Sequence, residues 1–147
     1  MKLVAKYFEE LTTLELYEIL RARAEIFVVE QNCVYQDLDG TDYRSLHIYF
    51  EEKGKVLAYL RAFKKTDMKN TVQMGRVLSI EHGIGLGGKI LIEGLELIRE
   101  KMNPDCIYIE AQCYAVGYYE KVGFKVCSEE FLEDGIPHVQ MKLMLDV

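Results

Sequence analysis

The chain has 147 residues, half of them hydrophobic, and a net charge of −6. This length favours a single domain over residues 1–147 with one hydrophobic core. The negative charge argues against nonspecific binding to nucleic acid or to an anionic membrane, because basic surfaces usually provide such binding.

The cysteine pattern bears on metal binding and on compartment. The chain has four cysteines, none spaced as C-x-x-C, and three widely separated histidines. This pattern argues against a zinc site, and we expect no metal. Neither a signal peptide nor an apolar run of membrane-spanning length is visible. We therefore expect a cytoplasmic protein with reduced thiols.

The first half of the chain alternates between strand and helix patterns. Lys2 to Tyr7 is typical of a short strand. A capping box formed by Thr12 and Glu15 begins an amphipathic helix that continues to Phe27. The elements expected next are a polar loop over 31–44, a hairpin of strands 45–52 and 56–64, and a strand over 71–80.

The second half begins with the strongest helical pattern, from Gly85 to Met102, which Asn103-Pro104 ends. The remaining elements expected are a strand over 107–111, a short helix over 114–122, and a closing hairpin of 125–131 and 138–145 around Asp134-Gly135. The resulting order is β-α-β-β-β-α-β-α-β-β. It contains one strong β-α-β crossover.

That crossover carries the segment Gly83-Ile84-Gly85-Leu86-Gly87-Gly88-Lys89. Unpaired N–H groups at a helix N-terminus form an anion site, so the segment predicts phosphate or pyrophosphate binding. It matches the Gly-x-Gly-x-x-Gly dinucleotide motif, and nearly matches a P-loop in which Ile90 replaces the Mg²⁺-ligating Ser or Thr. An NAD(P)- or nucleotide-binding domain is thus one alternative, although a single crossover argues against it. A tight turn without a ligand is another.

Two motifs in this order resemble those of the GNAT superfamily of acyl-CoA N-acyltransferases. The loop His82 to Gly87 resembles (Arg/Gln)-x-x-Gly-x-Gly/Ala, with His82 in place of the usual Arg or Gln. The segment Gln112-Cys113-Tyr114-Ala115-Val116-Gly117-Tyr118-Tyr119-Glu120-Lys121-Val122-Gly123-Phe124 resembles Asn-x-x-Ala-x-x-aromatic-Tyr-Glu-Lys-x-Gly-Phe. The connection from Val77 to Gly83 looks about two residues shorter than the family pattern implies. Further segments resemble the ElaA-like subfamily, namely 27–33, 35–42, His47, 75–77 and 134–138.

The resemblance implies an α/β fold with a mixed, twisted sheet of about seven strands flanked by helices. It also implies an acetyl-CoA-dependent N-acetyltransferase (EC 2.3.1 type) that acts on a primary amine directly, in a ternary complex. The alternative from another class is a non-catalytic acyl-CoA-binding or interaction module. The resemblance assigns the cosubstrate to Val77, Leu78, Ser79, His82, Gly83, Gly85, Gly87, Gly88, Lys89, Gln112 and Tyr119.

The resemblance also assigns catalytic roles. Tyr119 matches the family's general acid, with an aromatic packed on the core as the alternative. Glu110 is a candidate general base at the end of its strand; a surface glutamate is the alternative. His138 and His47 are lesser candidates, and a water chain without a single base is equally open. Cys113 has no adjacent base, which favours a small buried thiol over a nucleophile.

The loop after the first helix is interpreted as a wall of the acceptor site. Its acidic residues would attract a cationic amine, with a solvated acidic loop as the alternative. The spacing argues against a calcium loop, because Thr41 and Ile48 stand where carboxylate ligands are required. The residues assigned to the acceptor are Cys33, Tyr35, Asp37, Asp39, Asp42, Arg76 and His138. The acceptor itself, a small molecule or a peptide or protein amine, and a possible homodimer are left open by the sequence.

Overall fold

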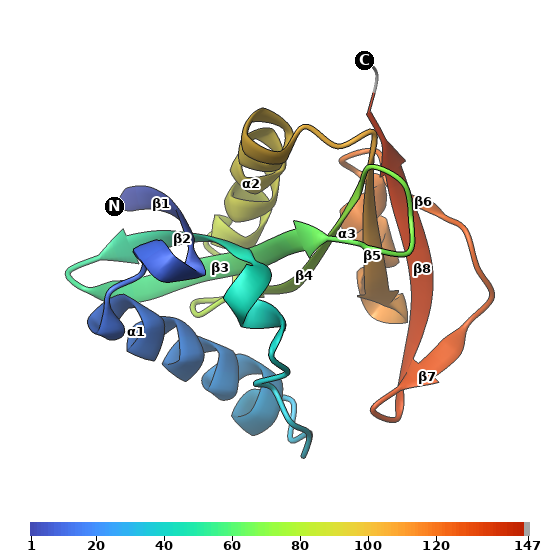
Figure 1. The fold of residues 1–147 in the computed structure, drawn as a ribbon. Helices are drawn as coiled ribbons and strands as arrows, with labels where there is room; N and C mark the ends of the chain where they lie inside the picture. Colours follow the sequence, from blue (N-terminus) through green and yellow to red (C-terminus); the bar gives the residue numbers. More distant parts are fainter. Residues whose placement is uncertain (146–147) are drawn as a thin grey trace.

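The computed structural model describes residues 1–145, in which eight strands form one mixed sheet (Figure 1). The strand order is β1-β2-β3-β4-β5-β8-β6, and β7 also pairs with β8. Every pairing is antiparallel except that of β4 with β5. The strands are β1 Lys2–Tyr7, β2 Leu46–Glu52, β3 Lys55–Lys64, β4 Thr71–Ser79, β5 Cys106–Gln112, β6 Lys125–Val126, β7 Phe131–Glu133 and β8 Ile136–Met144.

Helices α1 and α2 lie on opposite faces of the β1–β4 part of the sheet (Figure 1). Successive strand residues point to opposite faces. Leu60 of β3 therefore packs in the core under α2, while Tyr59 packs in the core under α1. No helix in residues 1–145 is both long and apolar enough to cross a membrane. The helices are α1 Thr13–Arg23, α2 Leu86–Met102 and α3 Val116–Glu120, and the short helical turns are η1 Phe8–Glu10, η2 Ala24–Glu30, η3 Thr41–Arg44 and η4 Cys113–Ala115.

The predicted fold class and element order are confirmed, with two local differences. The regular first helix ends at Arg23, and the chain continues through Glu30 with the wider winding of a π-helix. The strand expected over 125–131 is divided into β6 and β7. Between them the Gln140 N–H donates to Ser128 Oγ at 2.8 Å, so a side chain takes the place of a backbone acceptor.

The sheet opens between its two central strands. The parallel pairing of β4 with β5 covers only three residue pairs, from Thr71 with Cys106 to Gln73 with Tyr108. Beyond these pairs β4 stays with β3 and β5 stays with β8, so the strands diverge. The divergence leaves a wedge between the two halves of the sheet.

A β-bulge lies in β4 along this wedge. Tyr59 pairs with Leu78 and Arg61 pairs with Gly75, so Arg76 and Val77 together lie opposite the single residue Leu60. Arg76 has a φ of 53°, in the left-handed region that residues with a side chain avoid. The bulge therefore lies next to Gly75, but it is Arg76 that adopts the left-handed conformation.

A largely buried cluster of three arginines and three aspartates, with Asp39 at its exposed edge, joins α1 to this part of the sheet. The Arg23 side chain is fully buried; its Nε donates to Asp37 at 3.0 Å and its Nη1 to Asp42 at 2.6 Å. Arg61 donates to Asp39 and Asp42 at 2.6 and 2.9 Å. Burial opposes ionisation of Asp39 and Asp42, but the arginines outweigh it and lower the pKa of both carboxyls. We refer to these residues, with Arg76, as the Arg–Asp cluster.

The lowered pKa of Asp39 predicts how the cluster responds to acid. Its ion pair stabilises the native state fully above the unfolded-state pKa of about 4, and this contribution is lost as pH falls toward the lower native pKa. We therefore expect Asp39→Asn to be destabilised relative to wild type at pH 6, with the difference narrowing between pH 4 and pH 2.5. Urea unfolding at each pH measures it, and a difference that is constant or grows in acid would contradict the assignment.

Candidate functional site

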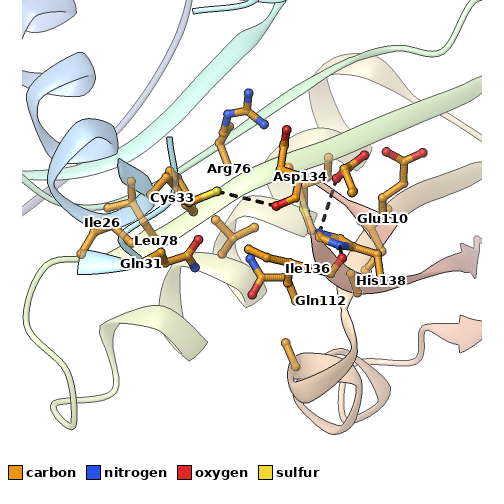
Figure 2. Close-up of a pocket in the computed structure, with 18 of the residues that line it drawn as sticks. Ile26, Gln31, Cys33, Arg76, Leu78, Glu110, Gln112, Asp134, Ile136 and His138 are labelled. Carbon is orange, nitrogen blue, oxygen red and sulfur yellow. Dashed lines mark hydrogen bonds and ion pairs between the residues drawn. The ribbon is translucent and has the colours of Figure 1, made fainter. Parts of the chain in front are cut away.

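A cavity of about 410 Å³ fills the wedge between β4 and β5. Its volume lies in the range typical of small-molecule sites. One wall comes from β4 and the segment after α1, and the other comes from β5 and the β7–β8 hairpin (Figure 2). The Cys33 thiol lies 3.9 Å from the Asp134 carbonyl oxygen and connects the two walls at the mouth. The cavity is therefore enclosed by segments that are far apart in the sequence.

The glycine loop leads from β4 into α2 beside this cavity. Gly83 and Gly85 have φ values of 84° and 80°, which glycine adopts without a steric penalty. Gly85 caps α2, and the first helical hydrogen bond runs from Lys89 N–H to Gly85 O at 3.1 Å. The N–H groups of the preceding first turn therefore lie ahead of any intrahelical bond, as an anion site requires.

The residues predicted to bind the cosubstrate are placed in two groups. Those lining the cavity are Val77, Leu78, Ser79, His82, Gln112 and Tyr119. The glycines Gly83, Gly85, Gly87 and Gly88 lie in the adjoining loop, outside the cavity lining. The Tyr118 hydroxyl donates to the Gly87 carbonyl and so ties α3 to the start of α2.

Lys89 and Ile90 follow the glycines in the first turns of α2. The Lys89 ammonium lies 5.4 Å from the centre of the Phe50 ring, its backbone N–H donates to Gly85 O, and the residue lies outside the cavity lining, so its assignment to the cosubstrate stays a prediction. Ile90, at the P-loop Ser/Thr position, is fully buried in the core and cannot offer a metal ligand. His82 pairs with Glu30 at 2.6 Å across the mouth of the cavity.

Tyr119 lies in the cavity wall with an unoccupied hydroxyl. Its ring makes edge contacts with Tyr118 and Phe124, at centroid distances of 5.1 and 5.8 Å. Within residues 1–145 no group is hydrogen-bonded to its hydroxyl. Burial raises the pKa of Tyr119, so the hydroxyl keeps its proton at neutral pH. The side chain therefore packs on the core and also presents a proton donor. The two interpretations of Tyr119, core packing and general acid, are compatible.

The opposite wall carries a pair of glutamates, Glu110 from β5 and Glu133 from β7. The Tyr108 hydroxyl donates to Glu110 Oε2 at 2.8 Å. Burial, and then the hydrogen bond and charge of Glu110, raise the pKa of Glu133. His138 Nδ1–H donates to the Ile136 carbonyl at 2.7 Å, which directs Nε2 to Glu133 at 3.4 Å. These groups can hold and move a proton at the cavity wall.

The predicted acceptor residues are only partly brought together. Cys33, Tyr35, Arg76 and His138 line the cavity, whereas Asp37, Asp39 and Asp42 do not. The expectation that these aspartates attract a cationic acceptor directly is wrong for Asp37 and Asp42. Both are buried, and all three aspartates are paired with arginines of the Arg–Asp cluster.

Two lesser candidates are also placed. His47 is fully buried between the Tyr59 hydroxyl and the Asp42 carbonyl, at 2.7 and 3.0 Å, and lies outside the cavity lining. Burial lowers its pKa, so it serves as a neutral hydrogen-bonding residue of the core rather than a base. Cys113 lies at the end of β5, outside the cavity lining, where burial raises the pKa of its thiol.

Three residues that shape the site were not predicted from the sequence, namely Glu133, Arg23 and Arg61. Glu133 directly precedes the Asp134-Gly135 turn. The turn residues indicate that Glu133 ends a strand, but they do not indicate which way its side chain points. Arg23 falls on the buried face of the predicted helix, where a charged residue signals a buried partner. In the described part of the chain, no group of three or more His, Cys, Asp or Glu residues is arranged to hold a metal ion.

Comparison with known proteins agrees with this geometry. The family model described as "Acetyltransferase (GNAT) domain" matches residues 15–145. A UPF0039 protein of Schizosaccharomyces pombe is 38% identical over 99% of this chain and 98% of its own length. The crystal structure of ElaA from Escherichia coli superposes with a TM-score of 0.89 at 33% identity, covering 97% of this chain and 98% of that one. The crystal structure titled an acyl-CoA N-acyltransferase from Pseudomonas aeruginosa has the same TM-score at 35% identity, covering 97% of this chain and 99% of that one.

The match covers both motif regions and both walls of the cavity, because the three relatives align over nearly their full lengths. The fold is that of the acyl-CoA N-acyltransferases, which supports acyl transfer. The chain belongs to the GNAT acetyltransferase family, in the group that includes ElaA and the UPF0039 proteins.

Proposed function

We propose that the protein transfers an acetyl group from acetyl-CoA directly to a primary amine. The observation that carries this proposal is the content of one cavity. It contains the diverging edge of β4, the Tyr119 hydroxyl and the glutamate pair, and it adjoins the glycine loop. In this proposal they serve as the cosubstrate site, the proton donor and the proton acceptor of one cavity.

The fit of acetyl-CoA rests on groups that the fold leaves available. The first-turn N–H groups of α2 suit a pyrophosphate, and the unpaired stretch of β4 suits an extended amide chain that binds as an added strand. The family membership supports this cosubstrate over NAD(P) or a nucleotide. A thioester bound there would supply the acyl group.

Charge in the cavity supports a cationic acceptor. The three arginines of the Arg–Asp cluster are matched by three aspartates, so the β4 wall carries little net charge. Glu110, Glu133 and Asp134 on the opposite wall have His138 as their neighbouring basic residue. Negative charge is therefore concentrated on the β5–β8 side. An alkylammonium, with a pKa of about 10, would be attracted to it and would lose a proton there before reacting.

Proton supply to the leaving group follows from Tyr119. A thiolate leaving group with a pKa of about 8.5 gains from a nearby acid. Because burial raises the pKa of Tyr119, its hydroxyl is protonated across the neutral range. In the proposed cycle the ammonium gives one proton to the glutamate pair, and the C–N bond forms as the C–S bond breaks. The thiolate takes a proton from Tyr119, and the second proton that the nitrogen loses restores the Tyr119 hydroxyl.

A cytoplasmic location is part of the proposal. All four cysteines are free thiols, as the reducing cytosol maintains them.

The cosubstrate is tested by thermal unfolding in parallel with acetyl-CoA, CoA, NAD⁺ and ATP–Mg²⁺. A ligand of the native state at about 100 times its Kd adds about 2.7 kcal/mol of stability and raises the Tm. We expect acetyl-CoA and CoA to raise the Tm and the other two to leave it unchanged. A shift with NAD⁺ or ATP–Mg²⁺ alone would overturn the acyltransferase proposal. A shift with CoA but no acetylation of a broad amine panel would favour the non-catalytic binding module.

The role of Tyr119 is tested by Tyr119→Phe, with Tyr17→Phe on the exposed part of α1 as the matched control. Loss of the proton donor should lower kcat by about 10²-fold or more, while the Tm and its acetyl-CoA shift stay near wild type. Steady-state acetylation of any amine that serves as substrate measures this. If kcat is unchanged in Tyr119→Phe, the hydroxyl only packs on the core and the assignment fails.

The role of the glutamate pair is tested by Glu133→Gln, with exposed Glu129→Gln as the control. The variant should raise KM for the amine because negative charge is lost from the wall, and leave KM for acetyl-CoA unchanged. Wild-type Glu133, with its raised pKa, becomes charged at higher pH than an ordinary glutamate. The acid limb of kcat/KM should therefore move to lower pH in the variant. An unmoved acid limb with an unchanged amine KM would contradict the role.

A further inference from the structure

Arg76 has an unfavourable backbone conformation in the wall of the cavity. Its φ of 53° is left-handed, and it forms the β4 bulge with Val77. Both residues and the neighbouring Gly75 line the cavity. A residue with a Cβ avoids this conformation unless its surroundings enforce it. The neighbouring glycine, which could adopt it freely, has a negative or extended φ instead.

Asp37 is the group that holds Arg76. Arg76 Nε donates to Asp37 Oδ1 at 2.8 Å, and Arg76 Nη2 donates to the Asp37 carbonyl at 3.2 Å. The next carboxylate, Asp39, is more distant from Arg76 Nη2, at 3.5 Å. The side chain and the main chain of one residue therefore fix the guanidinium in a single orientation.

Asp37 is itself fixed by Arg23, which lies outside the cavity, and by Tyr35, which lines it. The Asp37 residue is 5% exposed. Arg23 Nε donates to Oδ2 and Arg23 Nη2 to the Asp37 carbonyl, both at 3.0 Å, and the Tyr35 hydroxyl donates to Oδ1 at 3.0 Å. Arg23 is fully buried at the end of α1. The series of hydrogen-bonded side chains from Arg23 through Asp37 to Arg76 in the β4 bulge is therefore short and rigid.

We propose that Asp37 is a positioning residue that, through its ion pair with Arg76, holds the β4 bulge in the shape that the transfer reaction uses. This inference rests on the proposed function. It gives Arg76 a role in shaping the backbone, in place of direct recognition of the acceptor. It predicts that a carboxylate buried outside the cavity affects turnover.

The proposal is tested by comparing Arg76→Gly with Arg76→Ala. Both remove the ion pair, but glycine adopts the left-handed conformation without strain, whereas alanine drives the bulge to relax. A small displacement of reacting groups lowers turnover steeply. We expect kcat of the glycine variant to exceed that of the alanine variant by about 10-fold, with equal Kd for acetyl-CoA. Equal kcat in both, with an equally raised amine KM, would overturn the proposal and assign the guanidinium to acceptor binding.

A measurement without turnover separates this inference from the proposed function. Arg76→Gly should melt above Arg76→Ala by roughly 2–4 °C, since only alanine carries the backbone strain. In a double-mutant cycle, Asp37→Asn should lower the Tm less in the Arg76→Gly background than in wild type. Asp39→Asn, whose Arg76 contact is longer, should show less coupling. If Arg76→Gly melts at or below Arg76→Ala, or if Asp37 and Arg76 show no coupling, the positioning role is excluded even when the enzyme acetylates an amine. If no amine is acetylated while the coupling is present, the proposed function fails and the ion pair remains a structural clamp.

Discussion

The parallel pairing of β4 with β5 ends after three residue pairs, and the rest of the site depends on that limit. A buried strand normally satisfies its backbone groups on both sides. Past Gln73, β4 is paired only with β3, so its other edge faces the cavity and can bind an extended chain. The wedge is stable because each half has its own support: β4 is anchored to β3 and β5 to β8, and the main core continues beneath both.

The Arg–Asp cluster divides the electrostatics of this wedge between its walls. Four of its six charged groups, Arg23, Arg61, Asp37 and Asp42, are buried under α1, and the mutual pairing of all six leaves that wall close to neutral. An unpaired charge buried there would destabilise the protein by several kcal/mol, so each member depends on the others. Within residues 1–145, the glutamates of the opposite wall form no ion pair with an arginine. The wall that attracts a charged acceptor is therefore decided by which carboxylates are paired with arginines. The density of acidic residues in the sequence does not predict which wall that is.

The parts of the fold that were predictable from the sequence depend on local chemistry. The capping box of Thr12 with Glu15 forms as expected, with hydrogen bonds of 2.8 and 3.1 Å. Asp134 and Gly135 both adopt positive φ in a two-residue turn, and Asn103 ends α2 in the left-handed conformation. Each of these features is fixed by residues within four positions of one another. Local sequence patterns can predict interactions over that range.

The parts that escaped prediction are contacts between distant segments. Asp37 lies 14 positions from Arg23 and 39 from Arg76, so its loop reads as acidic and solvated although its carboxylate is enclosed by arginines. Glu133 reaches the cavity only because β7 folds back on β8 beside β5. Whether such a side chain is enclosed or reaches the cavity depends on the completed sheet, and neither periodicity nor composition encodes it.

Arg76 shows where local preference and the fold conflict. The sequence offers Gly75 for a bulge, yet the left-handed backbone falls on the arginine beside it. Shifting the bulge by one residue would reverse the faces to which the neighbouring side chains point, and would take the guanidinium away from Asp37. The ion pair thus selects one register of the bulge over another that the backbone alone would favour. A conformation that is unfavourable locally and enforced by a buried network is the kind of exception that proteins retain at working sites.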